Sequence, residues 1–323
     1  MPSRFLVAAA FGVMISTSFA AEKTFAEKTF AERLGWKRGS RVLILHCDDA
    51  GMSHESNLGI LKAMTAGVAT SASVMMPCPW VPEFVRLARR HPQLDIGLHL
   101  TLTAEWKDYR WGPVAGKPQV PGLSDREGCL PRRVEDVVRR ATPEEVETEI
   151  RAQIDRAFLM GLRPTHLDSH MGTLYANEAF FRRFLKVAIE KKIPLFIAAS
   201  FAEVVAEEKP ARVRTVKEAI KQVWDAGLPV IDFHMSATGR WRGGDKESRY
   251  RAFLKKLKPG VTMVIIHPIE FTECFASISS SGPKRAEDLS VVTDPVFARL
   301  LTEEKIILTT WRELKLRRDR AGK

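Results

Sequence analysis

The sequence lacks the features that mark several large classes of protein. It has one long uncharged apolar run, residues 5–20, which is too short and too early for a membrane-spanning helix, so a multi-pass membrane protein is excluded. Its four cysteines show no C-x-x-C spacing and would allow three pairings if oxidised, so no disulfide is assigned. A composition of 45% hydrophobic and 28% charged residues excludes collagen-like, disordered and disulfide-scaffold chains. We therefore expect a packed globular core.

The apolar run near the start has the form of an export signal. Arg4 precedes it, and Ser18-Phe19-Ala20 gives a small-x-small cleavage site. We predict a signal peptide over residues 1–20 and a secreted or periplasmic protein; an uncleaved N-terminal anchor is the alternative. Residues 21–40, which contain the pentapeptide AEKTF twice, are predicted to form a solvated helical lead-in.

The formal net charge of +11 favours anionic surfaces or substrates. The basic residues are scattered between acidic ones and form no recognition motif, so we expect no nucleic-acid partner.

Short apolar or β-branched runs alternate with amphipathic stretches from Arg41 onward. This order predicts an α/β fold with a parallel sheet or barrel, and we assign residues 41–316 to one barrel domain. Residues 104–140 are rich in glycine, proline and charge and are interpreted as a loop insertion that covers or binds something. The predicted strands are 41–46, 68–76, 95–102, 164–168, 194–199, 229–235, 262–267 and 305–310.

Polar side chains crowd at the carboxyl ends of these strands, which is the face where an α/β barrel assembles its active site. The groups in question are Asp48, Asp49, His99, Asp168, His170, His234 and His267. Strand alternation places His99 on the same face as Gly97 and Thr101, opposite the apolar Leu98 and Leu100.

Imidazole and carboxylate together suit Zn²⁺, Fe²⁺, Co²⁺ or Mn²⁺, and three ligands leave room for water and substrate. Asp49, His99 and His170 are the predicted metal ligands. Asp48 is then the candidate base towards water, and His267 the candidate acid or oxyanion stabiliser.

Each motif also has a structural interpretation. An Asp-Asp-x-Gly sequence after a strand is often a turn and helix cap, and a single histidine is often a hydrogen-bonded core residue. Asp168 and His170 could support ligands instead of binding metal, and His267 before Pro268 could simply end a strand. The metal hypothesis depends on all these groups reaching the same edge of one sheet.

Two loops supply candidate substrate-binding residues. The insertion carries Trp106, Tyr109 and Trp111, and the loop after the sixth predicted strand carries Arg240, Trp241 and Arg242. Rings can cover the apolar face of a sugar, and arginines can bind a carboxylate or sulfate. Asp168 and His234 complete the predicted substrate-binding set. The alternative is that the tryptophans fix their own loops to the barrel.

Five motifs together resemble the YdjC-like family of carbohydrate deacetylases, which includes the chitooligosaccharide deacetylases. They are LILHCDDAGMSHESNLGI near 43–60, AGVATSASVMM at 66–76, DIGLHLTLT at 95–103, RPTHLDSH at 163–170, and the strand ending in His267-Pro268. The resemblance implies a distorted (β/α) barrel and a divalent metal held by Asp49, His99 and His170. It also implies Asp48 as base and His267 as acid.

The sequence departs from that family at positions near the substrate. Met171-Gly172-Thr173 follows His170 where members often carry further histidines, and Ala50 stands where a bulky aromatic is usual. The predicted export also differs from the cytosolic chitobiose-processing relatives and indicates exported or cell-envelope glycans as substrates.

The leading hypothesis is a metal-dependent hydrolase that removes acetyl groups from N-acetylated sugars or oligosaccharides. The alternatives are a metallohydrolase of another ester class, such as a phosphoesterase, supported by Arg240, Arg242 and Arg249, and a glycan-binding protein without catalysis. We expect one divalent metal ion per chain, with Mg²⁺ and Zn²⁺ as the ions to test. An acetylated sugar is the expected partner, a homodimer is the assembly to test, and no stable membrane insertion is expected.

Overall fold

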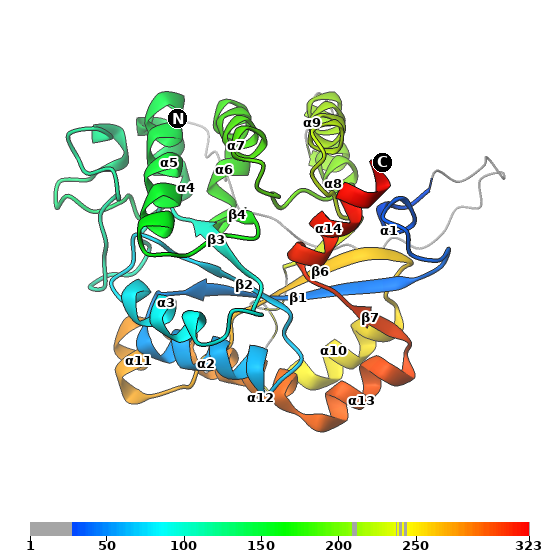
Figure 1. Cartoon of the computed structure of the whole chain (residues 1–323). Coiled ribbons are helices and arrows are strands. Elements are labelled where there is room, and N and C mark those ends of the chain that lie inside the picture. The colour runs from blue at the N-terminus through cyan, green and yellow to red at the C-terminus, as the bar shows by residue number, and fades with distance from the viewer. Residues whose placement is uncertain (1–27, 209–211, 237, 239–240, 242–243, 323) are drawn as a thin grey trace, which may run out of the picture.

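The computed structural model describes residues 28–208, 212–236, 238, 241 and 244–322. The predicted signal peptide at 1–20 lies outside the described residues, as does the first part of the 21–40 lead-in. A curved parallel sheet carries helices on both of its sides (Figure 1). This arrangement confirms the predicted fold class, a distorted (β/α) barrel.

Among the described residues, seven strands form the sheet, and each of their pairings is parallel. Six follow the order β4-β3-β2-β1-β6-β5, and β7 pairs with the first residues of β1. β1 is therefore central and is buried from Val42 to Ala50, as expected for a parallel strand covered on both faces. The strands are β1 (Arg41–Ala50), β2 (Ser71–Val74), β3 (Ile96–Leu100), β4 (Leu167–Ser169), β5 (Phe233–Met235), β6 (Gly260–Ile266) and β7 (Ile306–Leu308).

Residues 194–199, predicted as a strand, form only isolated bridges. Leu195 pairs with Leu167 in β4, and Ala198 pairs with Ile231 just before β5. The segment thus lies between β4 and β5, the two outer strands of the sheet. Its first part bridges to β4, and its last part bridges to the residues just before β5. The barrel is incomplete here because neither neighbour runs alongside the segment long enough to form a ladder.

Helix boundaries follow capping residues that are visible in the sequence. Thr142 and Glu145 form a reciprocal capping box at the start of α5 (Pro143–Leu159). The side chain of Asn177 accepts hydrogen bonds from two backbone N–H groups at the start of α7 (Glu178–Lys191). Both helices therefore begin directly after their capping residues.

The other helices complete the layers around the sheet (Figure 1). They are α1 (Phe30–Arg33), α2 (His54–Thr65), α3 (Val81–Arg89), α4 (Val134–Arg140), α6 (Thr173–Ala176), α8 (Phe201–Glu208), α9 (Val213–Asp225), α10 (Lys246–Lys255), α11 (Glu273–Ile278), α12 (Gly282–Thr293), α13 (Pro295–Glu303) and α14 (Trp311–Ala321), with 3₁₀ turns at Pro121–Leu123 and His170–Gly172. Of these, α14 crosses the expected domain boundary at residue 316. No helix of the described residues is both long enough and apolar enough to cross a membrane.

The 104–140 insertion is held to the barrel by buried polar contacts. The indole N–H of Trp111 donates to the backbone oxygen of Thr103 at 3.0 Å. The buried carboxylate of Glu149 on α5 accepts the N–H groups of Val114 and Ala115, both at 2.9 Å. The insertion therefore has a fixed place beside the carboxyl end of β3. All four cysteines of the chain have free thiols in this structure.

Candidate metal centre and active site

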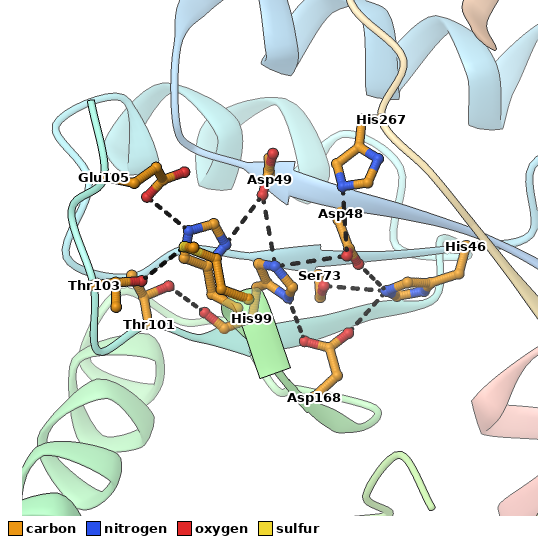
Figure 2. A network of polar contacts seen from close by, with 12 residues as sticks. His46, Asp48, Asp49, Ser73, His99, Thr101, Thr103, Glu105, Asp168 and His267 are labelled. Atoms are coloured by element: carbon orange, nitrogen blue, oxygen red, sulfur yellow. Dashed lines mark hydrogen bonds and ion pairs between the residues drawn. The ribbon is translucent and has the colours of Figure 1, made fainter. Parts of the chain in front are cut away.

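The predicted metal ligands and catalytic groups meet at one edge of the sheet (Figure 2). Asp48 and Asp49 end β1, His99 lies in β3, and His170 follows β4 directly. His267 follows the last residue of β6. The carboxyl ends of adjacent parallel strands thus bring together groups that are far apart in the sequence.

Two successive aspartates contribute to this cluster because the end of β1 is irregular. The register with β2 shifts between Cys47 and Ala50, so β1 carries an extra residue there. Asp49 adopts a left-handed backbone with φ 69°. A regular strand would direct consecutive side chains to opposite faces, whereas this irregularity lets both carboxylates contact the same imidazole, that of His99.

Asp49, His99 and His170 direct donor atoms at a common space. Oδ1 of Asp49 is 3.6 Å from Nε2 of His99 and 3.5 Å from Nδ1 of His170. All three residues are buried, and this Asp49 oxygen has no hydrogen-bond partner among the described residues. Ligand atoms about 2.1 Å from one tetrahedral metal lie about 3.4 Å apart, so the spacing suits a metal ion.

Both histidines are anchored through their other ring nitrogen. Nδ1 of His99 lies 2.6 Å from a carboxylate oxygen of Asp168, and Nε2 of His170 lies 3.0 Å from Glu105. A carboxylate on the far side of the ring is the usual support of a metal-binding histidine. The donor set therefore fits a divalent ion held through Nε2 of His99 and Nδ1 of His170.

The cluster has an excess of negative charge that favours a cation. Burial by itself lowers the pKa of His170, but the carboxylates of Glu105 and Asp49 outweigh burial and raise this pKa to about 10. The pKa of His99 is also raised, because Asp48 and Asp168 outweigh its burial. Burial would raise the pKa of Asp49, but the guanidinium of Arg285 and the nearby histidines hold it well below its usual range.

Asp48 lies between the metal ligands and His267. Its Oδ2 atom is 3.6 Å from Nε2 of His99 and 3.8 Å from Nε2 of His267. Burial and then Arg285 lower the pKa of His267, which favours the neutral form of its ring. A neutral imidazole beside a carboxylate can receive a proton and pass it on, which is the arrangement required for acid–base work.

The sequence of this chain matches a known protein family. The sequence profile described as YdjC-like protein matches residues 42–303. This chain belongs to the YdjC-like family. A Geobacillus stearothermophilus protein named carbohydrate deacetylase is 31% identical over 84% of this chain and 98% of its own length. A chitooligosaccharide deacetylase from Escherichia fergusonii is 36% identical over 40% of this chain and 49% of its own length.

A solved structure agrees with the barrel of this YdjC-like chain. The Enterococcus faecalis V583 protein named for cellobiose-phosphate cleavage superposes with a TM-score of 0.72 at 24% identity. The match covers 85% of this chain and 99% of that chain. At this identity the likeness establishes the fold alone.

Several residues of the site were not predicted from the sequence of this YdjC-like chain. Arg285 on α12 donates to Oδ2 of Asp49 at 2.6 Å and so leaves Oδ1 of that carboxylate for a metal. Glu105 supports His170 from the insertion. His46 carried a usable signal, because it precedes Asp48 by two residues on one strand and therefore shares its face.

Asp288 supports the backbone beside His267. One of its carboxylate oxygens accepts hydrogen bonds from Nζ of Lys246 at 2.6 Å and from the hydroxyl of Tyr250 at 2.8 Å. The other accepts from the backbone N–H of His267 at 3.2 Å. No sequence pattern indicated this network, because it joins β6 to two helices.

The predicted substrate-binding residues lie in several environments. Trp106 packs on Trp111, with ring centroids 5.5 Å apart, and Trp241 packs on Tyr250 at 4.8 Å. Asp168 lies beneath His99 as its support. His234 lies against Phe201, and burial lowers its pKa to about 4. Arg240 lies outside the described residues. These contacts favour a loop-fixing role for the tryptophans, and their binding role stays a prediction.

Replacing Trp111 by alanine is expected to destabilise the fold by about 3–5 kcal/mol, the usual cost of truncating a buried large aromatic side chain. Its side chain is only 4% exposed, and its indole N–H donates to the backbone oxygen of Thr103, just before the insertion. Thermal unfolding of the variant measures this effect. An unchanged melting temperature together with a raised KM would contradict it and favour a direct sugar contact.

Metal binding is expected to release protons and to weaken as the pH falls. In the metal-free chain the raised pKa of His170, about 10, keeps that ring protonated at neutral pH. A cation must displace this proton, so metal affinity rises with pH until the ring is deprotonated without metal. Calorimetric titration in two buffers of different ionisation enthalpy gives the proton count. Binding without proton release would contradict the assignment of His170 as a ligand.

Proposed function

We propose that this chain is a metal-dependent carbohydrate deacetylase that hydrolyses the acetyl amide of N-acetylated sugars or oligosaccharides. The observation that carries the proposal is the convergence of Asp49, His99 and His170, with Asp48 and His267 beside them. Each metal-facing histidine is oriented by a carboxylate, as a preorganised centre requires. Carbohydrate deacetylase is also the name of relatives matched over most of the chain.

The residues divide the chemistry of amide hydrolysis between them. Asp49, His99 and His170 would hold a divalent ion, which would supply a Lewis acid for the acetyl carbonyl. Asp48 accepts a proton from the attacking water as the water oxygen bonds to the carbonyl carbon. The ring of His267, 3.8 Å from Asp48, takes over that proton from Asp48 and donates it to the amine nitrogen as the carbon–nitrogen bond breaks. The products are acetate and the free amino sugar.

A cavity next to the centre is the proposed place for the sugar. Its volume is about 580 Å³, within the usual range for small-molecule sites. Glu105, which supports His170, and Met171, the residue after it, both line the cavity. The side chain of Met171 is 45% exposed and gives an apolar surface beside the metal ligands. An acetyl group at the metal would leave its sugar facing this cavity.

Acetate release tests the activity directly. Purified protein is incubated with N-acetylated and O-acetylated mono- and oligosaccharides and, separately, with a panel of phosphate esters. We expect acetate from the N-acetylated sugars and no phosphate. Of the arginines that supported a phosphoesterase, Arg249 pairs with Asp245 at 2.7 Å, and the other two lie outside the described residues. Phosphate release without acetate release would reverse the assignment.

The proposed ion is one Mg²⁺ or Zn²⁺ per chain. Elemental analysis of protein purified without chelators gives its identity and stoichiometry. Restoring activity to chelated protein with each metal in turn shows which ion supports turnover.

The proposed location is outside the cytoplasm, with exported or cell-envelope glycans as substrates. The support is the n-region, apolar run and small-x-small site within residues 1–20. Cell fractionation and N-terminal sequencing of the processed protein test it, and we expect a mature start near Ala21. A homodimer stays an expectation that light scattering of the purified protein can check.

A further inference from the structure

His46 lies directly behind the catalytic centre but belongs to neither the metal ligands nor the acid–base pair. It is on β1, two residues before Asp48, and its side chain is fully buried. A histidine in this position contributes no group that can reach the substrate. Its role must therefore come from the groups that it contacts.

One nitrogen of His46 joins two carboxylates (Figure 2). Nε2 is 2.9 Å from Oδ2 of Asp168 and 3.1 Å from Oδ1 of Asp48. The hydroxyl of Ser73 is 3.1 Å from the same nitrogen, and the hydroxyl of Ser71 is 3.1 Å from Nδ1. Both ring nitrogens are thus engaged, and the ring is fixed between β1 and β2.

These contacts continue to the metal ligands. Asp168 uses its other oxygen to hold Nδ1 of His99 at 2.6 Å. A continuous line of contacts therefore runs from the base Asp48 through His46 and Asp168 to the metal ligand His99. The ring of His46 therefore lies between the carboxylate of Asp48 and the carboxylate of Asp168, which supports His99.

The surroundings favour a protonated His46. Burial lowers its pKa, but the hydrogen bond to Asp168 and the close carboxylate of Asp48 outweigh burial and raise the pKa to about 9. The neighbouring His166, whose ring centroid is 5.0 Å away, behaves oppositely: burial and then the charge on His46 hold its pKa well below the usual range. His166 stacks on Trp311, with the two ring centroids 5.2 Å apart. The charge therefore resides on His46, between the two carboxylates.

We propose that His46 is a positioning residue for the deacetylase reaction, holding the base Asp48 and the supporting carboxylate Asp168 at a fixed separation. This inference rests on the proposed function. Without His46, two buried carboxylates would face each other without the cation between them, and Asp48 would move from its place between His99 and His267.

The same atoms suggest a rival arrangement that the experiment must separate. Donor atoms of His46, His166 and Asp168 lie within 4.8 Å of one another, so they could hold a second metal ion. Nε2 of His166 is buried and has no hydrogen-bond partner among the described residues. If His46 is a protonated bridge, the chain holds one metal ion, at Asp49, His99 and His170. If His46, His166 and Asp168 bind a second ion, the chain holds two metal ions.

The experiment uses the full metal-loaded protein and three variants. His46→Leu removes the bridge and keeps an apolar side chain, and His46→Gln keeps an N–H donor near the position of Nε2. His54→Leu is the matched control, because His54 makes a contact of similar length, 2.9 Å, to Glu83 on the surface. We measure kcat, KM for an acetylated sugar, bound metal and the nitrogen resonances of the His46 ring.

We expect kcat of His46→Leu to fall about 10- to 100-fold, a typical cost of losing support around a metal site, while KM stays within about twofold. His46→Gln should recover most of this loss, and His54→Leu should match the wild type. In a protein that already carries Asp48→Asn, His46→Leu should cause little further loss, because both changes act on the same base. Both ring nitrogens of His46 should carry protons at pH 7, with one metal ion per chain.

The proposal would be overturned by unchanged kcat in His46→Leu, by a neutral His46 ring, or by two ions per chain falling to one in His46→Leu. A fall in kcat that His46→Gln does not recover, with a lower melting temperature, would show only a packing role and would also overturn it. Failure of the wild type to release acetate from any acetylated sugar would instead reject the proposed function. The ring protonation and the metal count are read without any activity.

Discussion

Replacing Asp49, His99 or His170 by alanine is expected to remove the bound metal and to lower activity about 10³-fold or more, while the fold persists. The size follows from losing several kcal/mol of charge stabilisation in the transition state. The fold should survive because all three side chains lie at the ends of strands, above the apolar core. Elemental analysis, circular dichroism and acetate release measure the three effects.

At Asp49 the alanine variant needs a second variant beside it, because the backbone there is left-handed. Its φ of 69° is left-handed, and alanine there costs about 1–2 kcal/mol apart from any effect on metal. Asp49→Asn tolerates this conformation and keeps the shape of the side chain, so loss of metal from this variant reports on the carboxylate charge, including its ion pair with Arg285, and not on the backbone. Undiminished metal content in all three alanine variants would remove the assigned site.

The order of strands and helices could be read from the sequence because each signal is local. Apolar runs predicted the strands of the sheet, and the observed caps Thr142 and Asn177 are residue types that favour helix starts. The segment 194–199 was predicted as a strand but forms only isolated bridges. Its apolar residues fit a strand pattern whether or not another strand lies beside it. Pairing is a tertiary property, and one sequence does not contain it.

The gathering of the site residues could be predicted for a related reason. Groups at the carboxyl ends of parallel strands must meet, so Asp49, His99 and His170 could be placed together from their positions alone. The residues that support these ligands could not be predicted in this way. Arg285 lies on a helix that the sequence pattern did not indicate, and Glu105 lies within the insertion.

The aromatic residues illustrate a second limit of sequence reasoning. Trp111 in a loop rich in glycine and proline fits a sugar platform as well as a loop anchor. The structure places its ring against Trp106 and Tyr109, with only 4% of the residue exposed. Burial depends on how the whole insertion folds back on α5, and the local pattern does not contain this information.

Changing Asp48 to asparagine is expected to lower kcat by roughly 10² to 10⁴, the usual contribution of a general base, with metal still bound. Asparagine keeps the size of the side chain but cannot accept a proton at neutral pH. Metal should remain because the ligand atoms come from Asp49, His99 and His170, which the change leaves in place. Steady-state kinetics and elemental analysis on the same preparation measure both quantities.

Asp168→Asn is the control that separates a base from a support. Asp168 holds Nδ1 of His99 at 2.6 Å, so this variant should weaken metal binding about 10- to 100-fold and regain part of its activity at high metal concentration. The part not regained would come from its second contact, to His46 at 2.9 Å. Asp48→Asn should stay slow at every metal concentration, because its defect is in proton transfer. Near wild-type turnover in Asp48→Asn would show that Asp48 only shapes the end of β1, and His267 would then be the remaining candidate for acid–base work.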